Sequence, residues 1–111
     1  MAAAALGCFE AAEQVILMNP AQRKDYRAWA EPFHENVGER VGCLDQKLYH
    51  LWHGDLRDRR YRERHEGLRR FDFDPEKDLA LSESGCWRWA SHKPEMHRYV
   101  NDYFASRRED A

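Results

Sequence analysis

Two histidines, a tryptophan and a glycine stand immediately before the most arginine-rich stretch of this chain. The run Tyr49–Gly54 contains His50, Trp52 and His53, and seven arginines follow within residues 55–70. Neutral imidazole is a metal ligand or a proton carrier, and guanidinium holds phosphate through two parallel hydrogen bonds. These residue types in this order predict a site that combines a metal ion with a phosphate group.

The spacing of the two histidines leaves their roles open. His50 and His53 are three residues apart, and in a strand an odd offset sends side chains to opposite faces. Both can bind one ion only if Gly54 begins a turn. Otherwise one is a single metal ligand, or one is buried and hydrogen-bonded while the other is on the surface. Trp52 is either a core residue or a stacking platform at the edge of a cleft.

The arginines also have two interpretations. Arg57, Arg60 and Arg64 are candidates for binding a diphosphate or substrate because they follow His53 so closely. Alternatively, the arginine run is a solvated helix face with ion pairs to neighbours such as Asp58, since charge runs usually have that role.

Three other patterns resemble metal sites and are weaker. The set Cys43, His50, His53 and Cys86 lacks the tightly spaced ligand pairs of zinc fingers. Asp72-Phe73-Asp74 is an Asp-x-Asp pair, but it does not end a hydrophobic strand. The acidic residues from Asp72 to Glu83 match several EF-hand positions, yet Lys77 stands where that loop needs glycine. The sequence favours a solvated acidic loop here.

Composition limits the class of protein. A chain of 111 residues with 42% apolar side chains is one domain or a fragment of one, and it can form a core. The net charge of −2 argues against a nucleic-acid binder. The three cysteines form no close pair, which favours free thiols and a cytoplasmic location. No apolar run is long enough to span a membrane, and the start reads as a helix rather than a signal peptide.

Periodicity and turn residues predict a mostly helical α+β fold, with about four helices and a short β-hairpin or edge strands. Asn19-Pro20-Ala21-Gln22 has the form of a capping box, and Gly38 is a suitable terminator. Gly54 or Asp55 is expected to open the arginine-rich helix. The other expected elements are a helix over 2–18, a helix from Pro20 to Gly38, a strand or hairpin over 41–51, an acidic loop over 72–85, a strand over 86–90, a helix from Pro94 and a polar tail over 106–111. The helix from Pro94 is expected to carry an apolar stripe on one face, formed by Met96, Tyr99, Val100, Tyr103 and Phe104.

The helix expected over residues 2–18 is apolar on more than one side. In so short a chain this predicts a missing neighbour. The neighbour is either a second copy of the chain or an absent N-terminal half.

Several of these motifs together resemble the C-terminal segment of bacterial family-two-like glycosyltransferases with the GT-A fold. The resemblance covers most of the chain but only the tail of that family's domain. The residues that carry it are Tyr49-His50-Leu51-Trp52-His53-Gly54, Arg60-Tyr61, Arg64, Phe73-Asp74-Pro75 and Asp78-Leu79.

The resemblance implies a nucleotide-sugar donor, a glycan acceptor, and a nucleotide-binding half that is not in this chain. His53 or His50 would complete the shell of a Mn²⁺ or Mg²⁺ ion in the complete enzyme, and His53 is favoured because it precedes the glycine. Arg57, Arg60 and Arg64 would contact the diphosphate or the acceptor. The catalytic base would come from the missing half, so the isolated chain is expected to be inactive and to hold no metal. The alternative is a small, non-enzymatic helical binding or assembly module.

Overall fold

The computed structural model describes residues 1–49 and 59–107, and within them the chain is a mainly helical α+β structure. This confirms the predicted class, although the described part has six helices rather than about four. The elements are α1 (Ala2–Ala5), α2 (Phe9–Val15), α3 (Pro20–Val37), α5 (Glu63–Arg69), α6 (Pro75–Asp78), β1 (Leu79–Leu81), β2 (Trp87–Trp89) and α7 (Pro94–Ser106).

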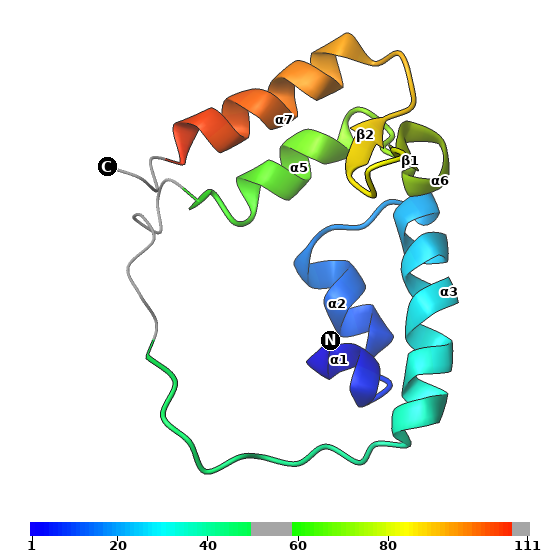
Figure 1. The fold of residues 1–111 in the computed structure, drawn as a ribbon, viewed down its shortest axis with the longest axis vertical. Helices are drawn as coiled ribbons and strands as arrows, with labels where there is room; N and C mark the ends of the chain where they lie inside the picture. Colours follow the sequence, from blue (N-terminus) through cyan, green and yellow to red (C-terminus); the bar gives the residue numbers. More distant parts are fainter. Residues whose placement is uncertain (50–58, 108–111) are drawn as a thin grey trace.

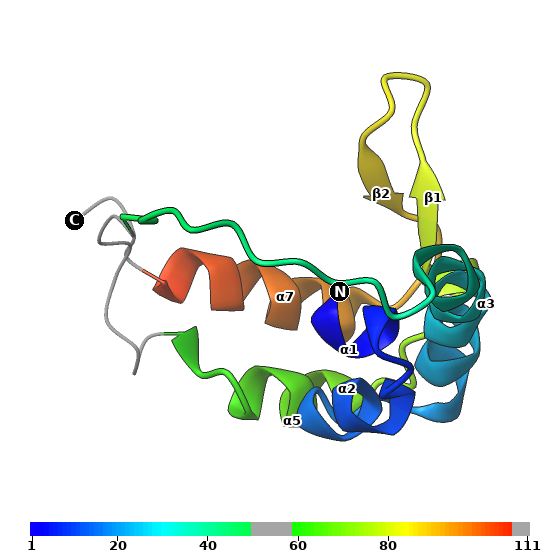
Figure 2. The ribbon, with the colours of Figure 1, turned by 90° about the horizontal axis from the view of Figure 1, so that it is seen from below.

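The helices form two groups that meet at one corner (Figure 1). In the first group α1 and α2 lie beside the long helix α3. In the second, α5 and α7 run side by side. Helix α6 and the β1–β2 hairpin occupy the corner between the groups, and the hairpin projects away from the helices (Figure 2).

The first predicted helix is interrupted. Gly7 adopts a positive φ of 67° and separates α1 from α2. The ring of His34 on α3 lies where a side chain at position 7 would stand, because a Cβ there would meet its Cε1 at 3.1 Å. His34 Nδ1 also lies 3.0 Å from the carbonyl oxygen of Ala5. Glycine therefore breaks the helix and allows α3 to approach, which buries Ala4 and Ala5.

Helix α3 begins and ends as the sequence predicts. The Asn19 side chain accepts a hydrogen bond from the Gln22 amide at 2.9 Å, and the Gln22 side chain accepts one from the Asn19 amide at 3.1 Å. Gly38 ends the helix in the left-handed conformation, with φ 56°. Pro32 lies inside the helix and does not split it. Asn19 also donates to the Phe73 carbonyl at 2.8 Å, which ties the start of α3 to the corner.

The strand predicted over residues 41–51 is absent from its described part, residues 41–49; positions 50 and 51 lie outside the described residues. A strand requires a neighbour to pair with its backbone, and this segment has none in the described chain. Its large apolar side chains are consequently exposed: Leu44 is 82% and Leu48 93% accessible.

The acidic stretch over residues 72–85 is not the loop that the sequence predicts. It contains α6 and β1, and β1 pairs with β2 in antiparallel register, with Leu81 opposite Trp87. The Asp74 side chain caps α6 by accepting from the Glu76 amide at 3.1 Å. A strand over residues 86–90 was predicted, and β2 confirms it. The charge pattern predicted a solvated loop, whereas the Asp74 and Asp78 carboxylates accept hydrogen bonds from nearby backbone amides.

A buried ion pair holds the corner together. Asp78 is only 1% exposed, and its Oδ2 accepts from Lys93 Nζ at 2.8 Å and from the Asp74 amide at 2.8 Å. Lys93 Nζ also donates to the Asp72 carbonyl at 3.0 Å, and the Ala90 amide donates to the Asp78 carbonyl at 2.9 Å. Asp78 is thus structural, which corrects the expectation that this acidic stretch is solvated.

Helix α7 confirms the predicted start at Pro94 and continues to Ser106. Met96 is fully buried, whereas Phe104, on the predicted apolar stripe, is largely exposed. Arg107 follows the helix, and the rest of the predicted polar tail lies outside the described residues.

Little apolar surface is enclosed. The buried apolar residues of the described part are Ala4, Ala5, Met18, Ala30 and Met96, and three of these are alanines. The radius of gyration is 16.6 Å, whereas a compact domain of this length would have about 13 Å. The described chain therefore has an open shape with a thin core.

Replacing Lys93 with Ala should destabilise the fold, because it leaves the buried Asp78 carboxylate without its cation. We expect a loss of about 1.5–3 kcal/mol in the free energy of unfolding, the range for hydrogen bonds to charged groups. Urea denaturation followed by circular dichroism measures it. Lys77→Ala is the control: Lys77 pairs with Asp74 on the surface, so its midpoint should stay near that of the original chain. Equal loss in both variants would contradict the role assigned to Asp78.

The same ion pair predicts a loss of stability in acid. Burial alone would raise the pKa of Asp78, but the hydrogen bonds from the Asp74 amide and Lys93 outweigh it and hold that pKa below its ordinary value. A carboxylate whose pKa is lowered by folding stabilises the fold above the unfolded pKa, about 3.9, and that contribution disappears as the pH falls through the folded value. Asp78→Asn should therefore be less stable at pH 7 and flatten the decline of unfolding free energy below pH 4. An unchanged acid profile would contradict this.

Candidate functional site

Of the six residues that the sequence proposes for the metal and phosphate site, the structure describes two. Arg60 and Arg64 lie on the chain entering α5 and within its first turn. His50, Trp52, His53 and Arg57 lie outside the described residues, as do Gly54 and Asp55, where the arginine-rich helix was expected to begin.

Local sequence explains how the arginines come to face α7. Arg60 has a positive φ of 40°, so the chain turns sharply before α5 begins at Glu63. One turn later, Gly67 leaves room for α7, because a Cβ at that position would collide with the phenol oxygen of Tyr99. The Tyr99 hydroxyl donates to the carbonyls of Glu63 and Arg64 at 3.3 and 3.2 Å. Glycine thus sets the close approach of the two helices.

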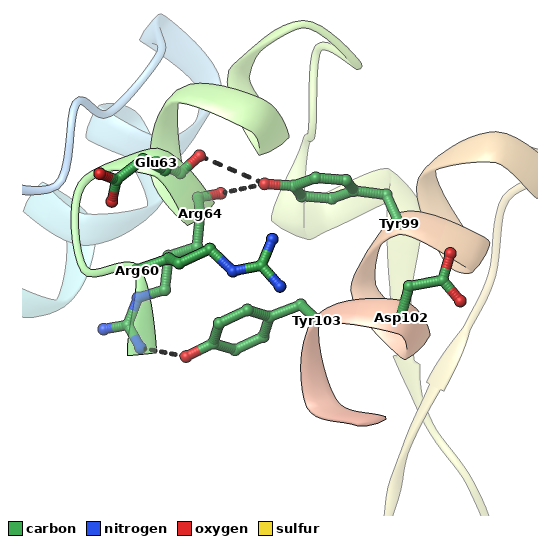
Figure 3. A pocket seen from close by; sticks show the side chains of 6 residues that line it. All are labelled: Arg60, Glu63, Arg64, Tyr99, Asp102 and Tyr103. Atoms are coloured by element: carbon green, nitrogen blue, oxygen red, sulfur yellow. Dashed lines mark hydrogen bonds between the residues drawn. The ribbon is translucent and has the colours of Figure 1, made fainter. Parts of the chain in front are cut away.

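A small pocket of about 110 Å³ lies between the two segments (Figure 3). Figure 3 shows the tyrosine rings of α7 directed toward the arginine-bearing segment, and the Glu63 and Asp102 carboxylates directed away from those rings. The lining residues are Arg60, Glu63, Arg64, Tyr99, Asp102 and Tyr103.

Arg64 is held in a fixed orientation. Its Nη1 donates to the Tyr103 hydroxyl at 2.7 Å. The guanidinium carbon lies 4.8 Å from the centroid of the Tyr61 ring and 5.7 Å from that of Tyr103. Tyr103 is itself positioned, because its hydroxyl donates to the Arg59 carbonyl at 3.2 Å. Aromatic faces attract a cation without neutralising it, so Arg64 keeps its charge beside the pocket.

Arg60 is less constrained. Its Nη2 donates to the Ser106 hydroxyl at 2.7 Å, at the end of α7. Neither Arg60 nor Arg64 forms an ion pair with a carboxylate in the described part of the chain, whereas Arg62 pairs with Glu66 at 2.9 Å. A guanidinium has five N–H donors. Both arginines of the pocket therefore keep donors that an incoming anion can use.

The positive charge of Arg64 affects the neighbouring imidazole. Burial lowers the pKa of His65, and the Arg64 charge lowers it further. Arg64 Nε also donates toward His65 Nε2 at 3.4 Å, which requires that nitrogen to be unprotonated. The neutral ring and the charged guanidinium are thus mutually consistent.

An arginine–aromatic seam continues beyond the pocket. A wider groove of about 600 Å³ shares Tyr99 and Asp102 with the pocket and is also lined by Arg70, Phe71, Glu95 and Arg98. The Arg70 guanidinium lies 4.7 Å from the Phe71 ring centroid and 5.2 Å from that of Tyr99. The seam between α5 and α7 therefore carries positive charge along more than one turn.

Sequence reasoning placed Tyr99 and Tyr103 on the core face of the last helix and did not include them in the site. Their spacing of four residues was a usable signal, because it puts two hydroxyl groups on one helical face. The apolar residues at positions 96, 100 and 104 lie on the same face, so the pattern indicated a core-facing stripe and not a pair of hydroxyl groups in a site.

No group of three or more metal-ligating side chains occurs within residues 1–49 and 59–107. Cys43 and Cys86 are exposed free thiols, and the histidines proposed to join them lie outside the described residues. Both the zinc hypothesis and the histidine metal site therefore stay predictions.

Arg64→Gln should raise the pKa of His65 toward its ordinary value, because it removes the second of the two causes that lower it. Burial remains, so the rise should be partial. A ¹H–¹³C NMR titration of the imidazole measures it, with Arg62→Gln as the matched control, since Arg62 pairs with Glu66 instead. An equal shift in both variants, or none in Arg64→Gln, would contradict the contact.

Comparisons of this chain with protein-family models, with curated proteins and with solved structures found no match. The resemblance to GT-A glycosyltransferases thus has no support from them and depends on the motif residues alone. In the described ranges, none of the helices combines the length and apolarity needed to cross a lipid bilayer.

Proposed function

We propose that this chain is the C-terminal, diphosphate- and acceptor-side portion of a nucleotide-sugar-dependent glycosyltransferase. The observation that carries the proposal is the placement of Arg60 and Arg64 in one pocket, where neither forms an ion pair with a carboxylate of the described residues although Glu63 and Asp102 also line it. Both belong to the motif that resembles that family. An arginine face that is simply solvated would be expected to pair with its own acidic neighbours, as Arg62 does with Glu66. Helix formation alone therefore does not explain the arrangement of Arg60 and Arg64.

The chemistry suits a leaving diphosphate. When the bond between the anomeric carbon of the sugar and the β-phosphate oxygen breaks, negative charge grows on the diphosphate. Fixed cationic donors stabilise that charge most when they need no reorganisation, and Arg64 is fixed by Tyr61 and Tyr103. Arg60, with one hydrogen bond to Ser106, can exchange that contact for a phosphate oxygen. A divalent ion would supply further charge neutralisation in a complete enzyme.

The thin core supports the view that a larger body completes this unit. Several large apolar side chains lie exposed on α2, on the segment after α3, and on the hairpin; they include Val15, Val41, Leu44 and Trp87. So many exposed apolar side chains beside so few buried ones indicate that this chain alone does not enclose a full core. The donor pocket and the catalytic base belong to the partner half in this proposal, so the isolated chain should bind a diphosphate without turning over a sugar nucleotide.

Isothermal titration calorimetry with pyrophosphate and with uridine diphosphate tests the site. Arg60→Ala and Arg64→Ala should each weaken binding about tenfold or more, since a charged hydrogen bond contributes about 1.5–3 kcal/mol. Arg62→Ala is the matched control, because it removes the same charge from the same segment outside the pocket. Its affinity should stay within about threefold of the original, because a surface charge in water acts weakly.

Two outcomes would overturn the proposal. One is equal weakening by all three substitutions, which would indicate a diffuse charge effect. The other is release of free uridine diphosphate from a uridine diphosphate sugar by this polypeptide alone, because a chain that contains only the diphosphate and acceptor side cannot complete transfer.

A further inference from the structure

The β1–β2 hairpin has an open edge on β1. Hydrogen bonds join Ser82 to Cys86 and Ala90 to Asp78, at 2.8 and 2.9 Å. Because inward and outward positions alternate in an antiparallel pair, the backbone groups of Leu79 and Leu81 point away from β2. Leu81 is 59% exposed, and Figure 2 shows the hairpin standing clear of the helices. An open edge of this kind accepts another strand.

The chain also holds a segment suited to be that strand. Residues 41–49 have the strongest strand pattern in the sequence, yet they form no strand in their own chain. Their hydrogen bonds within the backbone are local: the Val41 amide donates to Glu39 at 2.9 Å and the Gln46 amide to Leu44 at 2.9 Å. Val41, Leu44, Leu48 and Tyr49 are all exposed.

We propose that two copies of this chain associate by strand exchange, in which residues 41–49 of each copy add to the β1 edge of the other. The inference goes beyond the proposed function and stands on different residues. It predicts a closed, twofold-symmetric dimer, because each copy supplies one strand and one edge.

Chain length keeps the start of the segment, up to Leu44, from pairing with β1 of the same copy. Helix α3 has 18 residues, which is about 27 Å at 1.5 Å per residue. Its first residues lie at the corner that bears β1, as the Asn19–Phe73 and Lys24–Glu76 bonds show, so Gly38 is at the far end. Leu44 is six residues beyond Gly38 and extends at most about 20 Å. It cannot return to its own β1, and Figure 1 shows the segment leading away from that corner.

The side chains are also compatible. Alternation places Leu79 and Leu81 on the same hairpin face as their partners Trp89 and Trp87, and Arg88 with Ala80 on the other. An added strand that sets Leu44 and Leu48 beside the apolar face sets both Asp45 and Lys47 on the face that carries Arg88, so the apolar contacts and not the charges favour the pairing. The β2 edge is less suited, because the Trp89 ring stacks on His97 of α7, with centroids 4.4 Å apart.

Analytical ultracentrifugation over a concentration series tests the dimer. The original chain should dimerise, and Leu81→Pro should be monomeric at the same concentrations, because proline removes an outward N–H on the β1 edge. Trp87→Pro is the matched control: it is the cross-strand partner and removes an outward N–H on the β2 edge. It should still dimerise. A monomeric original chain, or equal loss in both proline variants, would overturn the proposal.

A second pair of variants separates strand exchange from other apolar contacts. Leu44→Asp combined with Leu48→Asp should abolish the dimer, whereas Val15→Asp, an equally exposed position on α2, should not. Loss of the dimer in Val15→Asp alone would show that it forms through residues 2–18 instead. Arg60→Ala should dimerise like the original chain, so failure here is distinguishable from failure of the diphosphate site.

Cross-linking of the native thiols tests the contact directly. Cys43 on the donated segment and Cys86 beside the hairpin turn are exposed and free. If the added strand is antiparallel to β1 with Leu44 opposite Leu81, Cys43 lies opposite Ser82, which pairs with Cys86. The two thiols are then two strand spacings, about 10 Å, apart, within reach of a short bismaleimide. In an equal mixture of ¹⁴N- and ¹⁵N-labelled Cys8→Ser protein, half of the Cys43–Cys86 linked peptides should carry one label of each kind. Linkage confined to single-label pairs would overturn the exchange.

Discussion

The fold depends on one buried carboxylate. Asp78 lies where α6 is followed by β1. Its side-chain Oδ2 accepts hydrogen bonds from Lys93 and from the Asp74 amide, and its backbone carbonyl accepts one from the Ala90 amide. These groups belong to the two flanks of the hairpin and to the residue before α7. A buried charge is tolerated only when it is paired and hydrogen-bonded, so the three segments must meet in one arrangement. In a chain with so few buried apolar side chains, this polar junction ties the residue before α7 to the α6–β1 corner, and the Asn19–Phe73 hydrogen bond ties α3 to the same corner.

The candidate site inherits its geometry from that junction. Helix α7 begins directly after Lys93, and its direction is what carries Tyr99 and Tyr103 along α5. Gly67 then permits contact close enough for the Tyr99 hydroxyl to reach two backbone carbonyls of α5. Arg64 gains Tyr103 as a neighbour through this approach, whereas Tyr61 belongs to its own segment. The orientation of the arginines is therefore a consequence of the corner and the glycine, rather than of the arginine-rich sequence itself.

Local signals in the sequence predicted those features that depend on neighbouring residues. The capping box at Asn19, the terminator Gly38 and the start of α7 at Pro94 each follow from a few side chains acting on their own backbone. Features that depend on distant partners were not predicted. The segment 41–49 has strand propensity but no strand beside it, and the acidic stretch conceals Asp78 because its cation, Lys93, is fifteen residues away.

The arginine site likewise combines a feature that the sequence predicts with features that depend on distant partners. Residue type and proximity to His53 predicted a site that includes Arg57, Arg60 and Arg64, and they gave no reason to separate Arg60 or Arg64 from Arg62. The structure supplies that reason through pairing: Arg62 is matched by Glu66 on its own helix, whereas Arg64 faces tyrosines and Arg60 a serine. Tyrosine and serine hydroxyls satisfy guanidinium donors without cancelling the charge. Glu63 and Asp102 line the same pocket but form no ion pair with either arginine among the described residues, and the proposed anion site depends on that lack of direct pairing.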